Sequence, residues 1–295
     1  MAARLNRVCS LWRDVSLDPQ LWQSLDLSTF FKERNRTETR LKWFIENRMA
    51  NCDEVNLGYW KITNVLVVLE RLLEHCPDLV GISLPGWRAL TNDHLAYITE
   101  NFKKLERLDL SSINMEMNTM KTAVGWQSLI AAIETVNKRL THLHLAHNQL
   151  AGVPHLATAL TQFAPNLILL DLSNVKTVAA SHGILHIESL QAGCQKLKIL
   201  RITNSHIFLG SSTLQEQMAS PGFPDLEELS VASLADESRL ISDETLQRIL
   251  KTSTKLKLLD VRGCARLTHD SLIRLPAWDL KHLFLSGCSV TRDLG

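Results

Sequence analysis

A six-residue pattern that recurs along the chain constrains its fold more than any other feature. Eight clear copies have the form L-x-x-L-x-L, with isoleucine or valine at some positions, and two weaker copies precede them. The ten copies begin at Trp22, Cys52, Leu79, Leu105, Leu140, Leu167, Leu197, Leu226, Leu256 and Leu280. They are spaced 24–35 residues apart. Because units of this size bury their apolar side chains only against their neighbours, the spacing predicts an open stack of repeats.

Each repeat is predicted to contain one strand and one helix. The last three positions of the pattern alternate as a strand does, so the strands should lie side by side in a parallel sheet. The intervening residues favour a helix, as in the tract that begins at Ser242. There, Leu246, Ile249 and Leu250 form an apolar stripe behind a serine cap. This pattern is typical of an α/β leucine-rich-repeat solenoid, a horseshoe with a concave parallel sheet and outer helices.

A further position supports the repeat assignment because it was not used to find it. Three residues after each strand, a side chain must point inward to close the turn. The occupants are mostly apolar or small: Phe30, Trp60, Trp87, Ile113, Asn148, Val175, Ser205, Leu234, Cys264 and Cys288. Asn148 is expected to bond the turning backbone through its amide. The 35-residue repeat that begins at Leu105 contains an insertion at 114–122, which we expect to bulge at the surface.

Composition and motifs favour a binding protein over an enzyme. The chain carries 32 Lys and Arg against 31 Asp and Glu, without the basic excess typical of nucleic-acid binders. Its six cysteines show no CxxC pair and no zinc-ligand spacing, so we expect free thiols and no metal. We find no catalytic residue pattern and no cofactor motif. The absence of a long apolar run and of a signal core predicts a cytoplasmic or nuclear protein without membrane contact.

The N-terminal residues and the cysteine-containing repeats together resemble a known family. Val8-Cys9, Trp12-Arg13, Asp18-Pro19 and Leu21-Trp22 resemble the second half of an F-box. The tract 263–272 resembles the cysteine-containing leucine-rich repeat, and Cys76 and Cys194 lie three residues before a repeat leucine, as in that subtype. The combination resembles the F-box/leucine-rich-repeat proteins, which are substrate-recognition subunits of Skp1–cullin–F-box (SCF) E3 ubiquitin ligases. The alternative is a non-ligase repeat scaffold or inhibitor whose first residues only cap the stack.

The resemblance implies two regions and a set of partner contacts. Residues 1–21 would form a partial, helical F-box, and residues 22–295 a solenoid of about ten repeats with an uncapped C-terminus. The candidate Skp1-binding residues are Leu5, Val8, Cys9, Trp12, Arg13, Pro19, Leu21 and Trp22. The helix that usually opens an F-box has no counterpart in this sequence. We therefore expect a fragment or short isoform, with binding to Skp1, and through it to cullin, weakened or lost.

A target protein would bind on the concave face, where the variable positions of the strands project. Those positions carry Arg107, Asp109, His142, His144, Leu169, Asp171, Ile199, Arg201, Glu228, Ser230, Leu258, Asp260, His282 and Phe284. We expect the apolar members Leu169, Ile199 and Phe284 to be exposed, and they are the stronger candidates because a partner could desolvate them. For any single position, an ordinary solvated sheet surface remains the alternative. The face has no dominant charge, so the pattern does not identify the protein substrate.

Overall fold

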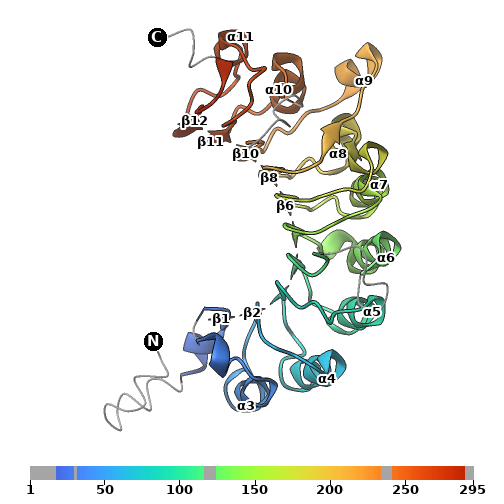
Figure 1. Ribbon diagram of the computed structural model, residues 1–295, viewed down its shortest axis with the longest axis vertical. Helices are drawn as coiled ribbons and strands as arrows, with labels where there is room; N and C mark the ends of the chain where they lie inside the picture. Colours follow the sequence, from blue (N-terminus) through green and yellow to red (C-terminus); the bar gives the residue numbers. More distant parts are fainter. Residues whose placement is uncertain (1–17, 30–31, 116–123, 234–240, 290–295) are drawn as a thin grey trace.

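The computed structural model describes residues 18–29, 32–115, 124–233 and 241–289, and it forms one curved stack of repeats (Figure 1). Ten strands make a single parallel sheet in the order β1-β2-β3-β4-β5-β6-β8-β10-β11-β12. The bounds of these strands are β1 Ser24–Asp26, β2 Glu54–Asn56, β3 Gly81–Ser83, β4 Arg107–Asp109, β5 His142–His144, β6 Leu169–Asp171, β8 Ile199–Arg201, β10 Glu228–Ser230, β11 Leu258–Asp260 and β12 His282–Phe284. Each predicted repeat thus contributes one strand.

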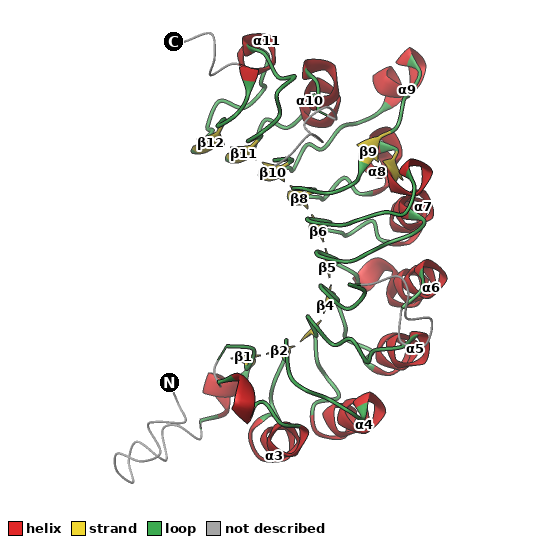
Figure 2. Ribbon diagram, viewed as in Figure 1, coloured by secondary structure: helices red, strands yellow, loops and turns green. Residues whose placement is uncertain are grey.

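Helices cover the outer side of the sheet, and the inner side is left open (Figure 2). The α-helices are α3 Glu38–Arg48, α4 Val65–His75, α5 Asn92–Asn101, α6 Trp126–Val136, α7 Val153–Phe163, α8 Ile187–Gly193, α9 Leu214–Ala219, α10 Asp243–Leu250 and α11 His269–Ile273. Short 3-10 helices are η1 Pro19–Trp22, η2 Glu33–Asn35, η3 Asn137–Arg139 and η4 Ala180–Gly183. A second, two-stranded sheet pairs β7 Ile184–Leu185 with β9 Phe208–Leu209. The predicted horseshoe with outer helices is confirmed.

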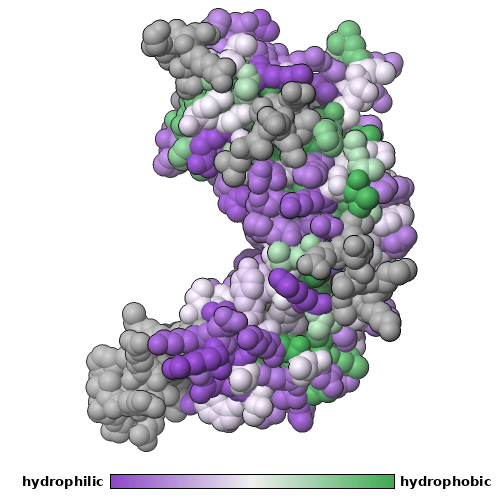
Figure 3. Space-filling model, in the orientation of Figure 1, coloured by the Kyte–Doolittle hydropathy of each residue, from purple (hydrophilic) through white to green (hydrophobic). Residues whose placement is uncertain are grey.

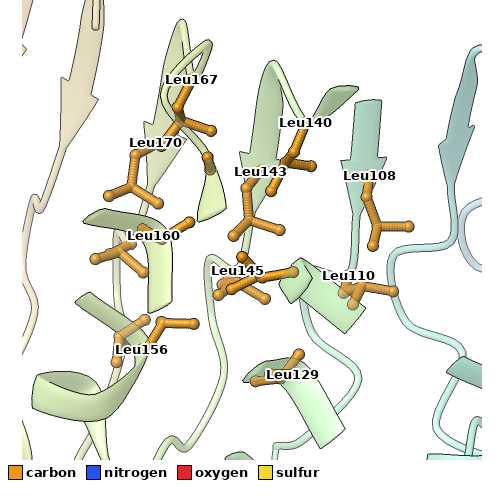
Figure 4. Close-up of a cluster of buried hydrophobic side chains, with 14 of the residues drawn as sticks. Leu108, Leu110, Leu129, Leu140, Leu143, Leu145, Leu156, Leu160, Leu167 and Leu170 are labelled. Carbon is orange, nitrogen blue, oxygen red and sulfur yellow. The ribbon is translucent and has the colours of Figure 1, made fainter. Parts of the chain in front are cut away.

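The core is a continuous spine of leucines that runs through the repeats. Strand residues such as Leu108, Leu143 and Leu170 point away from the concave face and meet helix residues such as Leu129 and Leu156 (Figure 4). All five are almost completely buried. Because every repeat packs against the next through these side chains, burial of apolar surface is the main contribution to the stability of the stack.

At several turn-closing positions, the side chain donates a hydrogen bond to the preceding repeat. The Trp60 indole Nε1–H donates to the carbonyl of Leu27 at 3.1 Å, and the Asn148 amide donates to the carbonyl of Leu110 at 2.8 Å. The Cys288 thiol likewise donates to the carbonyl of Val261. In each case, the acceptor is the last spine residue of the preceding repeat. The expected role of Asn148 is confirmed, and tryptophan and cysteine perform part of that role elsewhere.

A left-handed residue precedes the turn-closing position in nearly every described repeat. Backbone φ is positive at Tyr59, Gly86, Ser112, His147, Asn174, Asn204, Gly263 and Gly287. Glycine and short polar residues tolerate this conformation, whereas a tyrosine there is unusual. The sharp turn off the sheet therefore depends on backbone conformation as well as on the apolar spine.

The predicted cap at Ser242 is present, and two other helices have caps of the same kind. Ser242 accepts a hydrogen bond from the backbone N–H of Thr245 at 3.3 Å, and Asp243 and Glu244 occupy the first turn of α10. Thr91 and Thr268 cap α5 and α11 in the same way. These caps satisfy backbone donors that have no partner inside the helix.

The insertion predicted in the fourth repeat, which begins at Leu105, is anchored more firmly than expected. Residues 116–123 lie outside the described residues, so the expected bulge is not tested there. Asn114, its first residue, is buried rather than exposed. Its side chain accepts a hydrogen bond from the Val124 N–H at 3.0 Å and donates to the Val124 carbonyl at 2.6 Å. An amide bridge therefore closes the base of the insertion.

The cysteines are structural residues buried in the spine. Cys52, Cys76, Cys194, Cys264 and Cys288 are buried, whereas Cys9 lies outside the described residues. Burial raises the pKa of Cys76 and Cys194 to about 12. Because the thiolate is the reactive form, these thiols should be inert in the folded chain.

We predict that Cys52, Cys76, Cys194 and Cys264 resist iodoacetamide at pH 8 in the native chain and react once urea unfolds it. Mass spectrometry of tryptic peptides measures the labelling at each position. The expected protection is at least a hundredfold in rate, since the raised pKa of each thiol and its lack of solvent access act together. Rapid native labelling of Cys194 would contradict the buried structural role.

Candidate protein-binding site on the concave face

Two rows of side chains cross the concave face from strand to strand. Strand pairing aligns the first row as Ser24, Glu54, Gly81, Arg107, His142, Leu169, Ile199, Glu228, Leu258 and His282. The second row is Asp26, Asn56, Ser83, Asp109, His144, Asp171, Arg201, Ser230, Asp260 and Phe284. The inner edge of the horseshoe is largely hydrophilic (Figure 3). The sequence-predicted residues are therefore brought together on one surface.

The aspartates of the second row have a structural role that sequence reasoning missed. The Oδ1 atoms of Asp109 and Asp171 accept hydrogen bonds from the backbone N–H two residues later, both at 2.9 Å. Asp26 makes the same contact at 2.8 Å, and Asp260 makes it at 3.3 Å. A carboxylate in this position fixes the turn that leaves the strand. The recurrence of aspartate two positions before a turn was the signal available in the sequence.

A hollow of about 210 Å³ lies on the N-terminal half of the face. Gly81 leaves room in the first row, and an ion pair between Glu54 and Arg107 spans the gap that its missing side chain creates. Ser83 donates to Asp109 at 2.8 Å on the second row. This half of the face therefore offers a concavity that is crossed by paired charges.

A charged cluster occupies the middle of the face. Arg201 makes a two-pronged contact with Glu228, with Nε–Oε1 and Nη2–Oε2 distances of 2.7 and 3.1 Å. Asp171 lies between His144 and Arg201, at 3.7 and 3.9 Å respectively. Burial opposes ionisation of Asp171, but hydrogen bonds from His144 and Ser173 outweigh it and lower its pKa. These mutual contacts hold the charged side chains in fixed positions.

The C-terminal end of the face presents an aromatic side chain. Phe284 is 42% exposed, and the guanidinium of Arg262 lies 5.3 Å from its ring centroid. Arg262 is itself held by Asp260, with Nε–Oδ1 and Nη2–Oδ2 distances of 2.8 and 2.7 Å. An exposed aromatic ring beside a positioned arginine is typical of a protein-binding anchor.

Of the three apolar side chains expected to be exposed, only Phe284 is fully so. Leu169 is only 7% exposed because His142 and Ile199 flank it on the adjacent strands, so the expectation that it is open to a partner is wrong. Ile199 and Leu258 are half-buried, and Phe284 is exposed. The exposed and half-buried apolar side chains of the face therefore lie on its C-terminal strands.

The Skp1-binding candidates divide into two groups. Leu5, Val8, Cys9, Trp12 and Arg13 lie outside the described residues. Of the others, Pro19 begins η1, Leu21 is 50% exposed, and Trp22 is only 7% exposed. The guanidinium of Arg48 from α3 lies 5.8 Å from the Trp22 ring centroid. Trp22 thus packs into the first repeat, whereas Leu21 points to solvent.

Two other site types find no support in the part of the chain that the structure describes. Within the described ranges, no group of three or more His, Cys, Asp or Glu side chains is arranged to hold a metal ion. In the same ranges, every helix is too short or too polar to cross a bilayer.

Comparisons with known proteins point to a distant relative. No protein-family model matches the chain. An F-box/LRR-repeat protein of Arabidopsis thaliana is 23% identical over 225 residues, which are 70% of this chain and 66% of that protein. The match thus spans just under two thirds of the relative's length.

Solved structures that align with the chain do so with low identity and low TM-scores. A chain of the yeast Rad7 and Elc1 complex has a TM-score of 0.42 and 12% identity, over 97% of this chain and 85% of that chain. Internalin C2 from Listeria monocytogenes has a TM-score of 0.42 and 17% identity, over 74% of each chain. An LRR protein of Leptospira interrogans has a TM-score of 0.45 and 16% identity, over 93% of this chain and 57% of that chain. With TM-scores below 0.5, these likenesses carry no functional argument.

Proposed function

We propose that this chain is the substrate-recognition subunit of an SCF-type E3 ubiquitin ligase, which binds target proteins on its concave face. The observation that carries the proposal is the F-box-like tract that runs directly into the first repeat at Leu25. The distant relative, named as an F-box/LRR-repeat protein, supports the same pairing. The chain would perform no bond chemistry. It would hold a target near a ubiquitin-charged enzyme and so raise the effective concentration of a target lysine.

The proposal divides the chain into residues 1–21, which would contact Skp1, and residues 22–295, which would bind the target. Leu21 and Trp22 stand at this boundary and have opposite exposure. Leu21 would belong to the Skp1 surface, while Trp22 would join the F-box tract to the solenoid core. The proposal places the chain in the cytosol or nucleus, where its thiols would stay reduced.

A finer resemblance within the family does not enter the proposal. The tract 221–268 resembles F-box/LRR-repeat protein 6. The comparisons give this specific assignment no support, so the proposal is made for the family alone.

The test is co-purification with Skp1 after co-expression. The chain as it stands should retain little Skp1, whereas a version preceded by an F-box opening helix should retain it stoichiometrically. In that version, Leu21→Asp should reduce the retained Skp1 at least tenfold without a change in melting temperature, because an exposed apolar contact is replaced by a charge. Leu214→Asp, at a more exposed leucine on α9, is the matched control and should retain Skp1 fully.

Failure of the extended version to retain Skp1 would refute the ligase assignment. The second candidate, a non-ligase scaffold whose N-terminal residues cap the stack, would then be favoured. The burial of Trp22 beneath Arg48 supports that alternative, because an end coil needs a cover for its apolar side.

A further inference from the structure

A second concavity lies away from the concave face, where β2 and β3 end and the chain turns outwards. It encloses about 910 Å³, within the range of small-ligand and peptide sites. Its floor includes the buried rings of Trp60 and Trp87, each held by an indole hydrogen bond to the preceding repeat. Because both rings are buried and hydrogen-bonded to the preceding repeat, the floor is a rigid part of the solenoid. We call this concavity the turn groove.

Three cationic side chains from successive turns line the turn groove. They are Arg36, Lys61 and Arg88, and Glu33 is the acidic side chain among the lining residues. Lys61 pairs with Glu33 at 3.2 Å, and both side chains are about 70% exposed, so water and salt screen that pair strongly. Among the described residues, Arg88 donates to the thioether sulfur of Met115 at 3.2 Å and forms no ion pair. The groove therefore carries an excess of positive charge in a chain that is close to neutral overall.

A strained aromatic residue forms one wall of the turn groove. Tyr59 has a φ of 61°, a left-handed conformation that the equivalent turns give to glycine or to smaller polar residues in most cases. Its backbone N–H donates to Pro85 at 2.7 Å, and its ring lies against Gly86, where a Cβ atom would come within 2.7 Å of Tyr59 Cδ1. Even so, Tyr59 is 54% exposed. Strain of this kind is concentrated at binding sites, where a side chain must be held in one place.

We propose that the turn groove binds an acidic, partly apolar peptide segment of a partner protein. Carboxylates of the segment would meet Lys61 and Arg88, and an apolar side chain would rest against Tyr59 and Ile62, which lie above the buried tryptophans. A peptide suits the site better than nucleic acid because the cations surround an apolar floor and do not form a continuous basic track. The site is separate from the concave face, so its test does not depend on the ligase assignment.

The first test compares peptide classes on the intact chain. Purified chain is applied to an array of 12-residue peptides in three families of equal apolar content: acidic, basic and neutral. The acidic family should be enriched, and the best acidic peptide, labelled with fluorescein, should bind saturably in an anisotropy titration. The affinity should fall as salt rises from 50 to 300 mM, since exposed charges carry the attraction. No preference for acidic peptides would overturn the proposal.

Charge reversal locates the binding. Lys61→Glu with Arg88→Glu should weaken the peptide at least tenfold, and both side chains are exposed, so folding should be preserved. The matched control, Arg266→Glu with Arg274→Glu, makes the same change in net charge at exposed positions in the last repeats and should leave the affinity within twofold. Equal losses in both variants would show general electrostatic attraction and would refute a defined site.

Tyr59 provides a test that a merely structural residue would fail. Tyr59→Asn keeps a residue that tolerates the left-handed turn but removes the ring. The peptide affinity should fall about fivefold while the melting temperature stays the same or rises. A lower melting temperature with unchanged affinity would contradict the role of Tyr59.

A last experiment tests other classes of ligand, with a 12-nucleotide single-stranded DNA and with vesicles containing phosphatidylserine. If either one bound more tightly than the acidic peptide, and lost that binding on the same charge reversal, the proposal would be overturned.

Discussion

Replacing Gly263 with alanine should destabilise the C-terminal repeats by about 2–5 kcal/mol, through left-handed strain and overpacking together. Gly263 has a φ of 76°, and a Cβ atom there would lie 1.7 Å from the carbonyl oxygen of Ser233 in the preceding repeat. That oxygen belongs to the backbone of a packed turn, so it cannot move without displacing the neighbouring coil. Urea unfolding followed by circular dichroism measures the loss, and hydrogen exchange should locate it in the repeats on either side of Gly263.

Gly287→Ala separates the two causes. Gly287 has a φ of 81°, but the nearest atoms to its added Cβ, both from Gly263, lie at 3.3 and 3.4 Å. This variant should therefore lose about 1–2 kcal/mol, chiefly the cost of the left-handed backbone. Similar small losses of unfolding free energy in both variants would show that the turn at Gly263 can shift. The close approach to Ser233 would then not contribute to the cost of the substitution.

The sequence predicts the fold well because the repeat is read from local periodicity. The strand leucines, the cap at Ser242 and the hydrogen bonds of Asn148 all depend on residues close in sequence or on one recurring position. Burial at a given strand position is different, since it depends on what neighbouring repeats present. Leu169 was therefore expected to be exposed, although adjacent strands and side chains bury it.

Contacts between residues of different repeats could not be predicted from the sequence. The tryptophans at positions 60 and 87 replace the familiar asparagine as donors, which an apolar pattern does not reveal. The turn groove needs cations from three separate turns, and no motif joins Arg36 to Arg88. On the concave face, the rows of side chains follow from the repeat, but the turn-fixing role of Asp109 and Asp171 appears only in the geometry.

The contact between α8 and α10 is the clearest long-range feature of this kind. Arg248 and Glu188 lie 60 residues apart and form a two-pronged ion pair, with Nε–Oε1 and Nη2–Oε2 distances of 2.8 and 2.9 Å. Both side chains are about 90% buried, and Arg248 also donates to the Gly210 carbonyl at 2.9 Å. Helix α9 lies outside this contact (Figure 1). The pair therefore joins two helices across an intervening repeat whose own helix is displaced.

Removing Arg248 should destabilise the chain by about 3–5 kcal/mol, because Arg248→Ala leaves the Glu188 carboxylate buried without its partner. In the native chain, burial opposes ionisation of Glu188, but the hydrogen bonds and charge of Arg248 outweigh it and lower the pKa. The pair thus stabilises the fold fully above the ordinary pKa of 4.5, and this contribution is lost as pH falls through 4.5 and below.

In Arg248→Ala the sign of this dependence should reverse. Burial would then raise the pKa of Glu188, so acidification from pH 7 to pH 5 would neutralise the unpaired charge and restore part of the lost stability. Thermal melts of the wild type and the variant at both pH values measure the effect as a difference between the two chains. The double variant Arg248→Met with Glu188→Leu should recover most of the stability at pH 7, since it removes both charges and keeps the volume. Two results would contradict this role of the ion pair: a loss of unfolding free energy below about 1 kcal/mol in Arg248→Ala, or the same loss at both pH values. Either result would mean that Glu188 reaches solvent in the variant and that the pair does not hold α8 and α10 together.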